Sequence, residues 1–211
     1  MVATFEALSA SRQDKVRATV VALECASRPL PAAMFPALAE APLRHVVEDV
    51  LEASGRVLIA SGGGFISGYA DDVAERLADE GLGILAATDR AVLTIVMIFS
   101  VAIPRARGEL PVDAPWTTGQ PVPDALFKDS MIQDVDTTDA IRRLRRASLL
   151  TRVPGKGLQL GEQFHRLTRQ GTTLLFEQLI LLAEPRGSLA ESIRRHREPP
   201  VATTSPSGGS L

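Results

Sequence analysis

The most apolar stretch of the chain lies near its middle, over Thr88–Leu110, and residues 91–103 within it contain only two polar side chains. Periodicity alone does not separate a buried helix from a pair of strands in such a run. A helix is favoured because Thr88 or Asp89 can cap its start and Pro104 can stop it. At about 14 residues it falls short of the roughly 20 that cross a bilayer. We expect a central core helix with a similar module on each side.

The pattern before this stretch predicts three helices, a hairpin and a fourth helix. Apolar residues four and three positions apart give residues 12–26 one buried face, and a short helix at 31–40 leads to an amphipathic helix at 42–54. Two β-prone runs flank a triple glycine within residues 56–70, which predicts a hairpin. Residues 71–80 return to helical spacing.

The same order recurs after the central stretch. A loop rich in proline and glycine at 108–123 precedes a short helix at 124–133 and a longer one at 137–147. A second hairpin is expected over 149–160, and residues 162–183 are again helical and apolar near their end. Repetition at this scale indicates two copies of one module.

These patterns together predict a mainly α fold with short β-hairpins, built as tandem winged-helix domains. We place the first domain at residues 12–86 and the second at 87–184, including the C-terminal apolar helix. Residues 194–211 are rich in Pro, Ser and Gly, so we expect a disordered tail there.

Composition narrows the class of protein. The chain has 211 residues, of which 45% are hydrophobic, and a net charge of -2, so no global basic field draws it to nucleic acid. Aromatic residues make up 4%, which disfavours binding of single strands by base stacking. Cys25 is the single cysteine, which excludes a disulfide framework, and we expect it to be a small core residue. The start of the chain shows no secretion signal, so we expect a cytoplasmic protein.

Few residues could carry chemistry. The GGGFISG and PGKG segments lack the spacing of phosphate-binding loops, and both are expected to be hairpin turns. His45, His165 and His196 are far apart in sequence and share no ligand spacing with Cys25, so no metal site is expected. We therefore predict a protein that is not an enzyme and uses no cofactor.

The third helix of each module carries a different charge. In winged helices this helix usually enters the major groove while the wing contacts phosphate. The first module has Arg44 against three carboxylates there, which phosphate would repel. The second module has a cluster of cations, which are candidate DNA-binding residues unless they form an ordinary solvated face. They are Arg142, Arg143, Arg145, Arg146, Arg152 and Lys156.

Three segments give the chain a resemblance to a known family. LIASGGGFISGYADDVAERL is a glycine-rich hairpin turn followed by a polar helix, and TDRAVLTIVMIFSVAIPRARGEL is a long apolar helix opening the second module. DVDTTDAIRRLRRASLL is a helix that ends in a leucine pair before the wing. Over residues 12–170 this layout resembles the ScpB/MukE-like kite family, the tandem winged-helix subunits of SMC–kleisin condensin complexes. The long loop 108–123 and the addition after 172 fit a MukE-like or plasmid-defence subunit as well as an ScpB-type one.

The resemblance implies a non-enzymatic accessory subunit that dimerises, binds a kleisin-like protein and works with an SMC ATPase in the cytoplasm at the nucleoid. Its role would lie in chromosome segregation or condensation, or in plasmid defence. Apolar side chains of both modules are candidate partner-binding residues. They are Leu43, Val47, Leu51, Leu175 and Leu179. The alternative is a winged-helix transcriptional regulator that binds double-stranded DNA through its second module.

Overall fold

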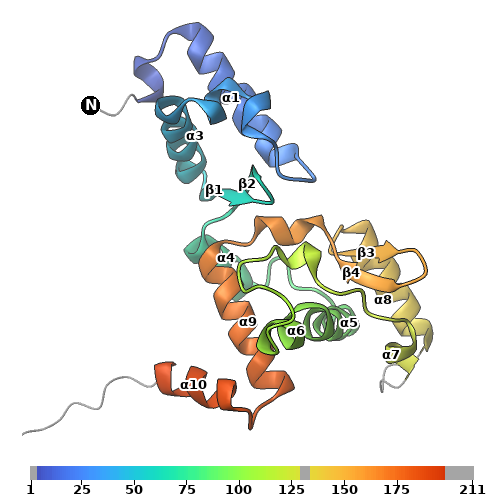
Figure 1. Cartoon of the computed structure of the whole chain (residues 1–211). Coiled ribbons are helices and arrows are strands. Elements are labelled where there is room, and N and C mark those ends of the chain that lie inside the picture. Colours follow the sequence, from blue (N-terminus) through green and yellow to red (C-terminus); the bar gives the residue numbers. More distant parts are fainter. Residues whose placement is uncertain (1–3, 129–133, 198–211) are drawn as a thin grey trace, which may run out of the picture.

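The computed structural model describes residues 4–128 and 134–197 of the chain. These residues form a mainly helical protein with two antiparallel two-stranded hairpins, which confirms the coarse fold class expected from the sequence. Figure 1 shows two lobes, one built from the N-terminal helices and one from the rest of the chain, with the first hairpin between them.

The first lobe contains the helices and hairpin that the sequence pattern predicts. Its elements are η1 (Phe5–Ala7), α1 (Ala10–Cys25), η2 (Ala32–Met34), α2 (Pro36–Ala39), α3 (Ala41–Ala53), β1 (Arg56–Ser61) and β2 (Gly64–Tyr69). Gly55 ends α3 with a φ of +71°, and Gly62 and Gly63 form the hairpin turn at +56° and +80°. Positive φ at both central residues is the requirement of a type I′ turn, which explains two of the three glycines.

The second lobe follows the connecting helix α4 (Asp71–Asp79). Its elements are α5 (Ala87–Met97), η3 (Ile98–Ala102), α6 (Ile103–Ala106), η4 (Trp116–Thr118), α7 (Ala125–Lys128), α8 (Asp134–Arg146), β3 (Leu150–Val153), β4 (Gly157–Leu160), η5 (Glu162–Arg166), α9 (Arg169–Ala183) and α10 (Ser188–Arg197). In Figure 1, α4 lies beside α9 and away from α1 and α3.

The central apolar stretch is helical, as predicted, but Pro104 does not stop it. Helix α5 continues through a π-helical turn, η3, into α6 and ends at Ala106. Proline has no N–H to donate to the carbonyl of Ser100, and that carbonyl instead accepts from the backbone N–H of Gln120 at 2.9 Å. The expected N-cap is also wrong, since the cap residue is Ala86 and makes no side-chain cap hydrogen bond.

The continuous helix also removes the length argument against a membrane span. Among the helices of the described residues, Ala87–Ala106 is long and apolar enough to cross a bilayer. Half of its most apolar window is buried inside the protein, which fits the core helix of a soluble protein. The expectation of a soluble protein therefore depends on this burial and not on helix length.

One kind of backbone pairing occurs in both lobes. Leu30, between α1 and α2, exchanges two hydrogen bonds with Phe65 of β2, at 2.7 and 2.9 Å. Val122, between α6 and α7, exchanges two with Leu158 of β4, at 2.6 and 2.9 Å. Each lobe thus has a residue from the segment after its first helix paired to the second strand of its hairpin.

Each lobe has its own hydrophobic core. The first is built from α1, α2 and α3, and its buried members are Val16, Leu23, Ala37, Leu38, Leu43, Val46, Val47 and Leu51. The second surrounds α5 and extends from Val92 to Ala190 and Ile193 of α10. Helix α4 contributes buried residues to neither core. Two separate cores are what two modules joined by a connector require.

Three sequence expectations need correction. Residues 162–183 are not one helix, because Leu167 and Thr168 separate η5 from α9. The predicted tail begins too early, because residues 194–197 belong to α10, whereas 198–211 lie outside the described residues. Of the predicted helix 124–133, residues 125–128 form α7, and 129–133 also lie outside the described part.

Candidate functional site

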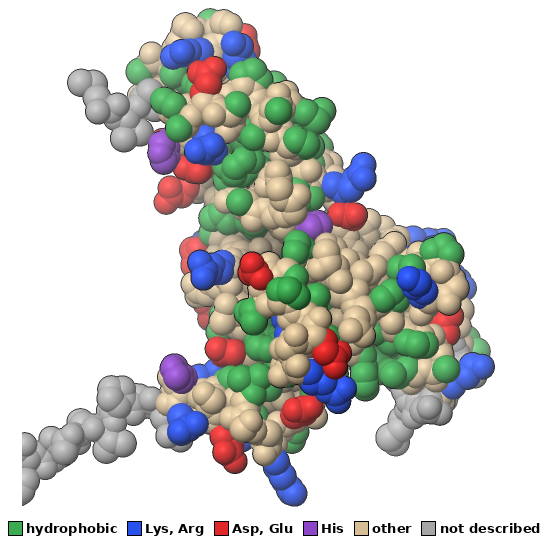
Figure 2. Space-filling view, viewed as in Figure 1, with side chains coloured by type: hydrophobic (Ala, Val, Ile, Leu, Met, Phe, Trp, Pro, Cys, Tyr) green, Lys and Arg blue, Asp and Glu red, His purple; other side chains and the backbone are tan. Residues whose placement is uncertain are grey.

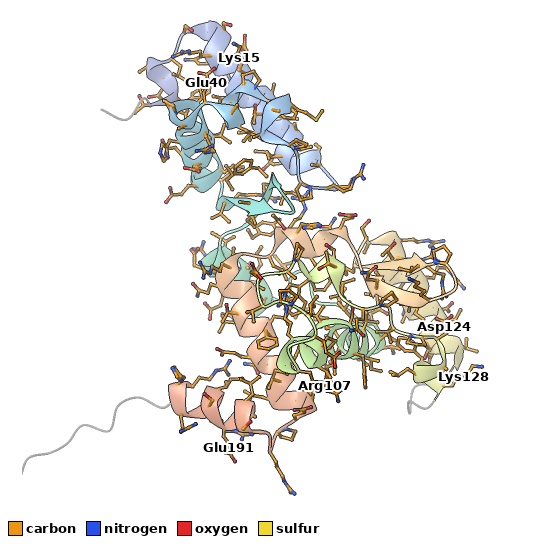
Figure 3. The ribbon with its side chains drawn as sticks, in the orientation of Figure 1. Lys15, Glu40, Arg107, Asp124, Lys128 and Glu191 are labelled. Atoms are coloured by element: carbon orange, nitrogen blue, oxygen red, sulfur yellow. The ribbon has the colours of Figure 1, made fainter. Side chains whose placement is uncertain are left out.

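The cationic cluster predicted from the sequence lies on one exposed face of the second lobe. Helix α8 supplies Arg142, Arg143, Arg145 and Arg146, β3 supplies Arg152, and the hairpin turn supplies Lys156. All six side chains belong to exposed residues. Asp124 and Lys128 lie at the neighbouring edge of the lobe, by α7 (Figure 3).

Arg143 forms an ion pair within the lobe. Its Nε lies 3.1 and 3.0 Å from the two carboxylate oxygens of Asp89, and one Nη lies 2.6 Å from Oδ1. The Asp89 side chain is only 7% exposed, so the pair ties α8 to the first turn of α5. These hydrogen bonds raise the pKa of the Arg143 guanidinium. Asp89 is therefore the buried anchor of α8 and not a helix cap.

Two further cations also face carboxylates. Arg152 donates to both oxygens of Asp124 at 2.8 and 3.2 Å, which raises the pKa of its guanidinium. Arg142 lies 2.9 Å from Asp139, three residues earlier on α8. Half of the predicted DNA-binding cluster is thus neutralised within the lobe. Among the described residues, Arg145, Arg146 and Lys156 are the members without a carboxylate partner.

A groove of about 500 Å³ runs along this face. Arg145 and Arg142 line it together with Arg152 and Lys128, and the ring of Phe127 forms part of its wall. Guanidinium groups along a groove can contact phosphate oxygens, each neutralised phosphate releasing counterions. Chemically, the groove can hold an anionic backbone, although Arg145 is the one of the three unpaired cations that lines it.

The equivalent face of the first lobe is acidic, as the sequence indicates. Arg44 of α3 turns inward, where it donates to the carbonyl of Leu38 at 3.0 Å and lies over the Phe65 ring. His45 is 2.8 Å from Glu48 on the surface of the helix. The outer side of α3 therefore presents mainly carboxylates, which disfavours contact with phosphate.

The predicted partner-binding leucines and valine are mostly inside the protein. Leu43, Val47 and Leu51 are at most 2% exposed and build the first core. Leu179 is 4% exposed, and Leu175 is half-buried against the second core. Their helical spacing is that of core residues, so they are not available to another chain in this conformation.

Two other leucines of α9 do reach solvent. Leu174 is 48% exposed and Leu182 is 63% exposed, and little more than two helical turns separate them. Figure 2 shows hydrophobic side chains in small groups over both lobes, with acidic and basic side chains between them. The apolar residues of α9 are visible in the sequence, but periodicity alone did not separate the exposed leucines of this helix from the buried ones.

The junction between the lobes is a feature that sequence reasoning missed. Arg166 of η5 donates to the carbonyls of Glu24 and Ala26 at the end of α1 and to the carbonyl and hydroxyl of Ser67 in β2. Thr168, which caps α9, also donates to Asp71 at the start of α4 at 2.5 Å. These contacts join residues that are 97 to 142 positions apart, so no local pattern could reveal them.

His165 lies in the same junction and touches both lobes. Its Nδ1 is 2.7 Å from the hydroxyl of Ser61 in β1, and its Nε2 is 3.1 Å from the hydroxyl of Thr117. Glu162 lies 3.4 Å from Nε2, and the histidine side chain is 10% exposed. Burial lowers the pKa of His165, partly opposed by the charge of Glu162. The histidine is thus a structural link between the lobes.

Side chains suited to metal binding do not gather in residues 4–128 and 134–197. No set of three or more His, Cys, Asp or Glu side chains in this part of the chain could hold a metal ion. Cys25 is exposed at the end of α1, so the prediction of a core cysteine is wrong.

Comparison with known proteins adds little. No known protein family and no curated protein matches the sequence. A crystal structure of a conserved hypothetical protein from Chlorobium tepidum aligns with 79% of this chain and 97% of its own, at 17% identity and a TM-score of 0.31. A likeness this low carries no argument about fold or function.

Proposed function

We propose that the protein is a kite-type accessory subunit of an SMC–kleisin complex, a non-enzymatic scaffold that dimerises and holds a kleisin-like chain. The observation that carries the proposal is the repeated pairing of Leu30 with Phe65 and of Val122 with Leu158. In each lobe this pairing places a third extended segment beside the hairpin, as a winged-helix domain would require. Two such units in one chain are the layout that the sequence resemblance implies.

The junction supports a scaffold role. An accessory subunit has to present surfaces to other chains in a fixed relation, and Arg166 with Thr168 joins the lobes by side-chain hydrogen bonds across the interface. Exposed Leu174 and Leu182 on α9 offer an apolar contact surface of the kind that buried interface centres use.

Co-purification from the native host tests this proposal. We expect the tagged chain to recover a coiled-coil ATPase and a kleisin-like protein, and the double variant Leu174→Ser with Leu182→Ser to lose them. Val21→Ser is the matched control, since Val21 is 59% exposed on α1, in the other lobe. Recovery of neither partner by the unaltered chain would contradict the proposal.

A second candidate function is binding of double-stranded DNA, in the manner of a winged-helix transcriptional regulator. The specific support is the groove along α8, which Arg145 lines, together with Arg146 and Lys156, which are also exposed and without a carboxylate partner among the described residues. The internal pairing of the other three cations reduces the charge available to phosphate, which is why we place this function second.

Charge reversal separates the two functions. If DNA is bound here, Arg145→Glu with Arg146→Glu should weaken it and flatten the plot of log affinity against log salt by roughly two, at about 0.9 per lost phosphate contact. Arg194→Glu with Arg195→Glu on α10 is the control for net charge. Equal weakening by both double variants would show that the α8 face is not the contact.

A further inference from the structure

A cavity of about 860 Å³ lies at the junction of the two lobes. The first lobe contributes β1 from Ile59 and the turn glycines 62 and 63. The second lobe contributes the loop 112–116, η5 and the first turn of α9. Small-molecule sites favour such interdomain positions, and the volume lies within their usual range of about 300–1,000 Å³.

Arg105 of α6 lines this cavity with a buried and unpaired charge. The residue is 6% exposed, and its guanidinium donates to the carbonyl of Ala114 and lies 5.2 Å from the Trp116 ring centre. Its Nε has no hydrogen-bond partner, and no carboxylate of the described residues lies within ion-pair distance. Buried cations are normally paired with an opposite charge, so the surroundings of this guanidinium suit an anionic ligand.

Trp116 is a second buried side chain in which a hydrogen-bond donor has no partner. It lines the same cavity, is 4% exposed, and its indole N–H also lacks a partner. Its ring stacks on Phe164 with centroids 5.7 Å apart. Two orphaned donors on adjoining side chains are unusual, since a buried donor without an acceptor costs about 1–3 kcal/mol. A guanidinium group beside aromatic rings suits a ligand that has both an anionic group and an apolar part.

The rim of the cavity adds positive charge. Arg169 is exposed at the first position of α9 and makes no ion pair among the described residues, and the helix N-terminus carries a partial positive charge there. The opposing group is Asp113, an exposed carboxylate that also lines the cavity. It acts on Arg105 only at a distance, and burial remains the larger influence, which lowers the pKa of that guanidinium.

We propose that this junction cavity binds a small carboxylate with an apolar body. The carboxylate lies on the side of Arg105 and Arg169, and the apolar body lies against Trp116 and Phe164. Because the walls come from both lobes, the ligand also links them. This inference does not depend on the proposed function and assigns a site that an adaptor would not need.

The chain contains its own reporter for this proposal, because Trp116 is its single tryptophan. Titration of the full chain with cyclohexanecarboxylate at constant ionic strength should change the indole emission along a saturating curve. Cyclohexanecarboxamide has the same shape without the charge and should bind at least about tenfold more weakly, in line with loss of a charge-assisted hydrogen bond.

Three variants locate the bound carboxylate. Arg169→Gln should weaken binding about threefold, as expected for an exposed charge, and Asp113→Asn should tighten it about twofold. Arg107→Gln is the control, since Arg107 is exposed, lies by α6 in Figure 3 and does not line the cavity. Its dissociation constant should match that of the unaltered chain.

Arg105→Gln should weaken binding at least about tenfold, with folding checked by circular dichroism. If that variant does not fold, the opposite shifts of Arg169→Gln and Asp113→Asn still decide the question. A linear emission change without saturation, equal binding of the carboxamide, or unchanged affinity in both rim variants would overturn the proposal.

Discussion

At the scale of single residues, the role of an arginine depends on whether a carboxylate lies within ion-pair distance. Asp89 is almost fully buried and is held by Arg143, so what looks like a DNA-binding arginine is first a counter-ion. Arg105 is equally buried but has no carboxylate of the described residues within ion-pair distance, which is why we propose it as a ligand-binding residue. Arginine is therefore the counter-ion of a buried carboxylate at position 143 and a proposed ligand-binding residue at position 105.

His165 gives a pH dependence of stability. Burial lowers its pKa in the folded protein, so the unfolded chain binds the proton more readily, with an ordinary pKa of about 6.5. The contribution of His165 to the free energy of unfolding is therefore complete above about pH 6.5. It falls as the pH drops from there towards the lowered pKa of the histidine in the folded protein. His165→Gln should flatten this slope in thermal melts recorded across that range.

His45→Gln is the matched control for that measurement, because His45 is exposed on α3. It should leave the slope of the unaltered chain in place. An identical slope in the His165→Gln variant would show that other groups cause the acid sensitivity.

At the scale of elements, the central helix survives its proline because another segment supplies the missing hydrogen bond. The carbonyl of Ser100, which a regular helix would pair with residue 104, accepts from Gln120 in the loop that follows. Gly119 brings that loop close enough, since a Cβ there would lie 2.5 Å from the Ser100 hydroxyl oxygen and 2.6 Å from its carbonyl.

Gly119→Ala should therefore lower the free energy of unfolding by about 1–3 kcal/mol, the usual cost of overpacking. Chemical denaturation is the measurement. Gly187→Ala is the control, because its Cβ would meet nothing closer than 3.3 Å. Equal losses in both variants would mean that the loop can move away from the helix at little cost.

At the scale of the whole molecule, two separate cores behave as one unit only if the junction holds. Arg166 provides four of its hydrogen bonds. Gly68 allows the close approach, since a Cβ at that position would lie 2.3 Å from the carbonyl oxygen of Arg166. The backbones of the two lobes thus come into direct contact at this point.

Arg166→Ala should uncouple the lobes. We expect calorimetry to resolve two unfolding transitions in the variant where the unaltered chain gives one, because each lobe keeps its own core. Arg169→Ala, three residues on and without a side-chain hydrogen bond in the described structure, should leave a single transition. A single, merely shifted transition in Arg166→Ala would contradict this account.

The sequence predicted the helices and hairpins better than the side-chain contacts between them. Periodicity placed α3 and both hairpins, since the burial of Val47 and the turn at Gly62 depend on local spacing. It could not place Arg143 on Asp89 or Arg166 on Ser67, because these pairs are 54 and 99 positions apart. It also misjudged Pro104, whose effect on the helix depends on a loop that the local pattern does not show.

The hydrogen bonds of Arg166 also determine when the N-terminal lobe can complete its structure during translation. The carbonyls that end α1 belong to residues 24 and 26, and the side chain that satisfies them is translated 140 or more positions later. While the nascent chain leaves the ribosome, the end of that first helix has only water as its partner. The N-terminal lobe thus completes its structure only after most of the second lobe has emerged.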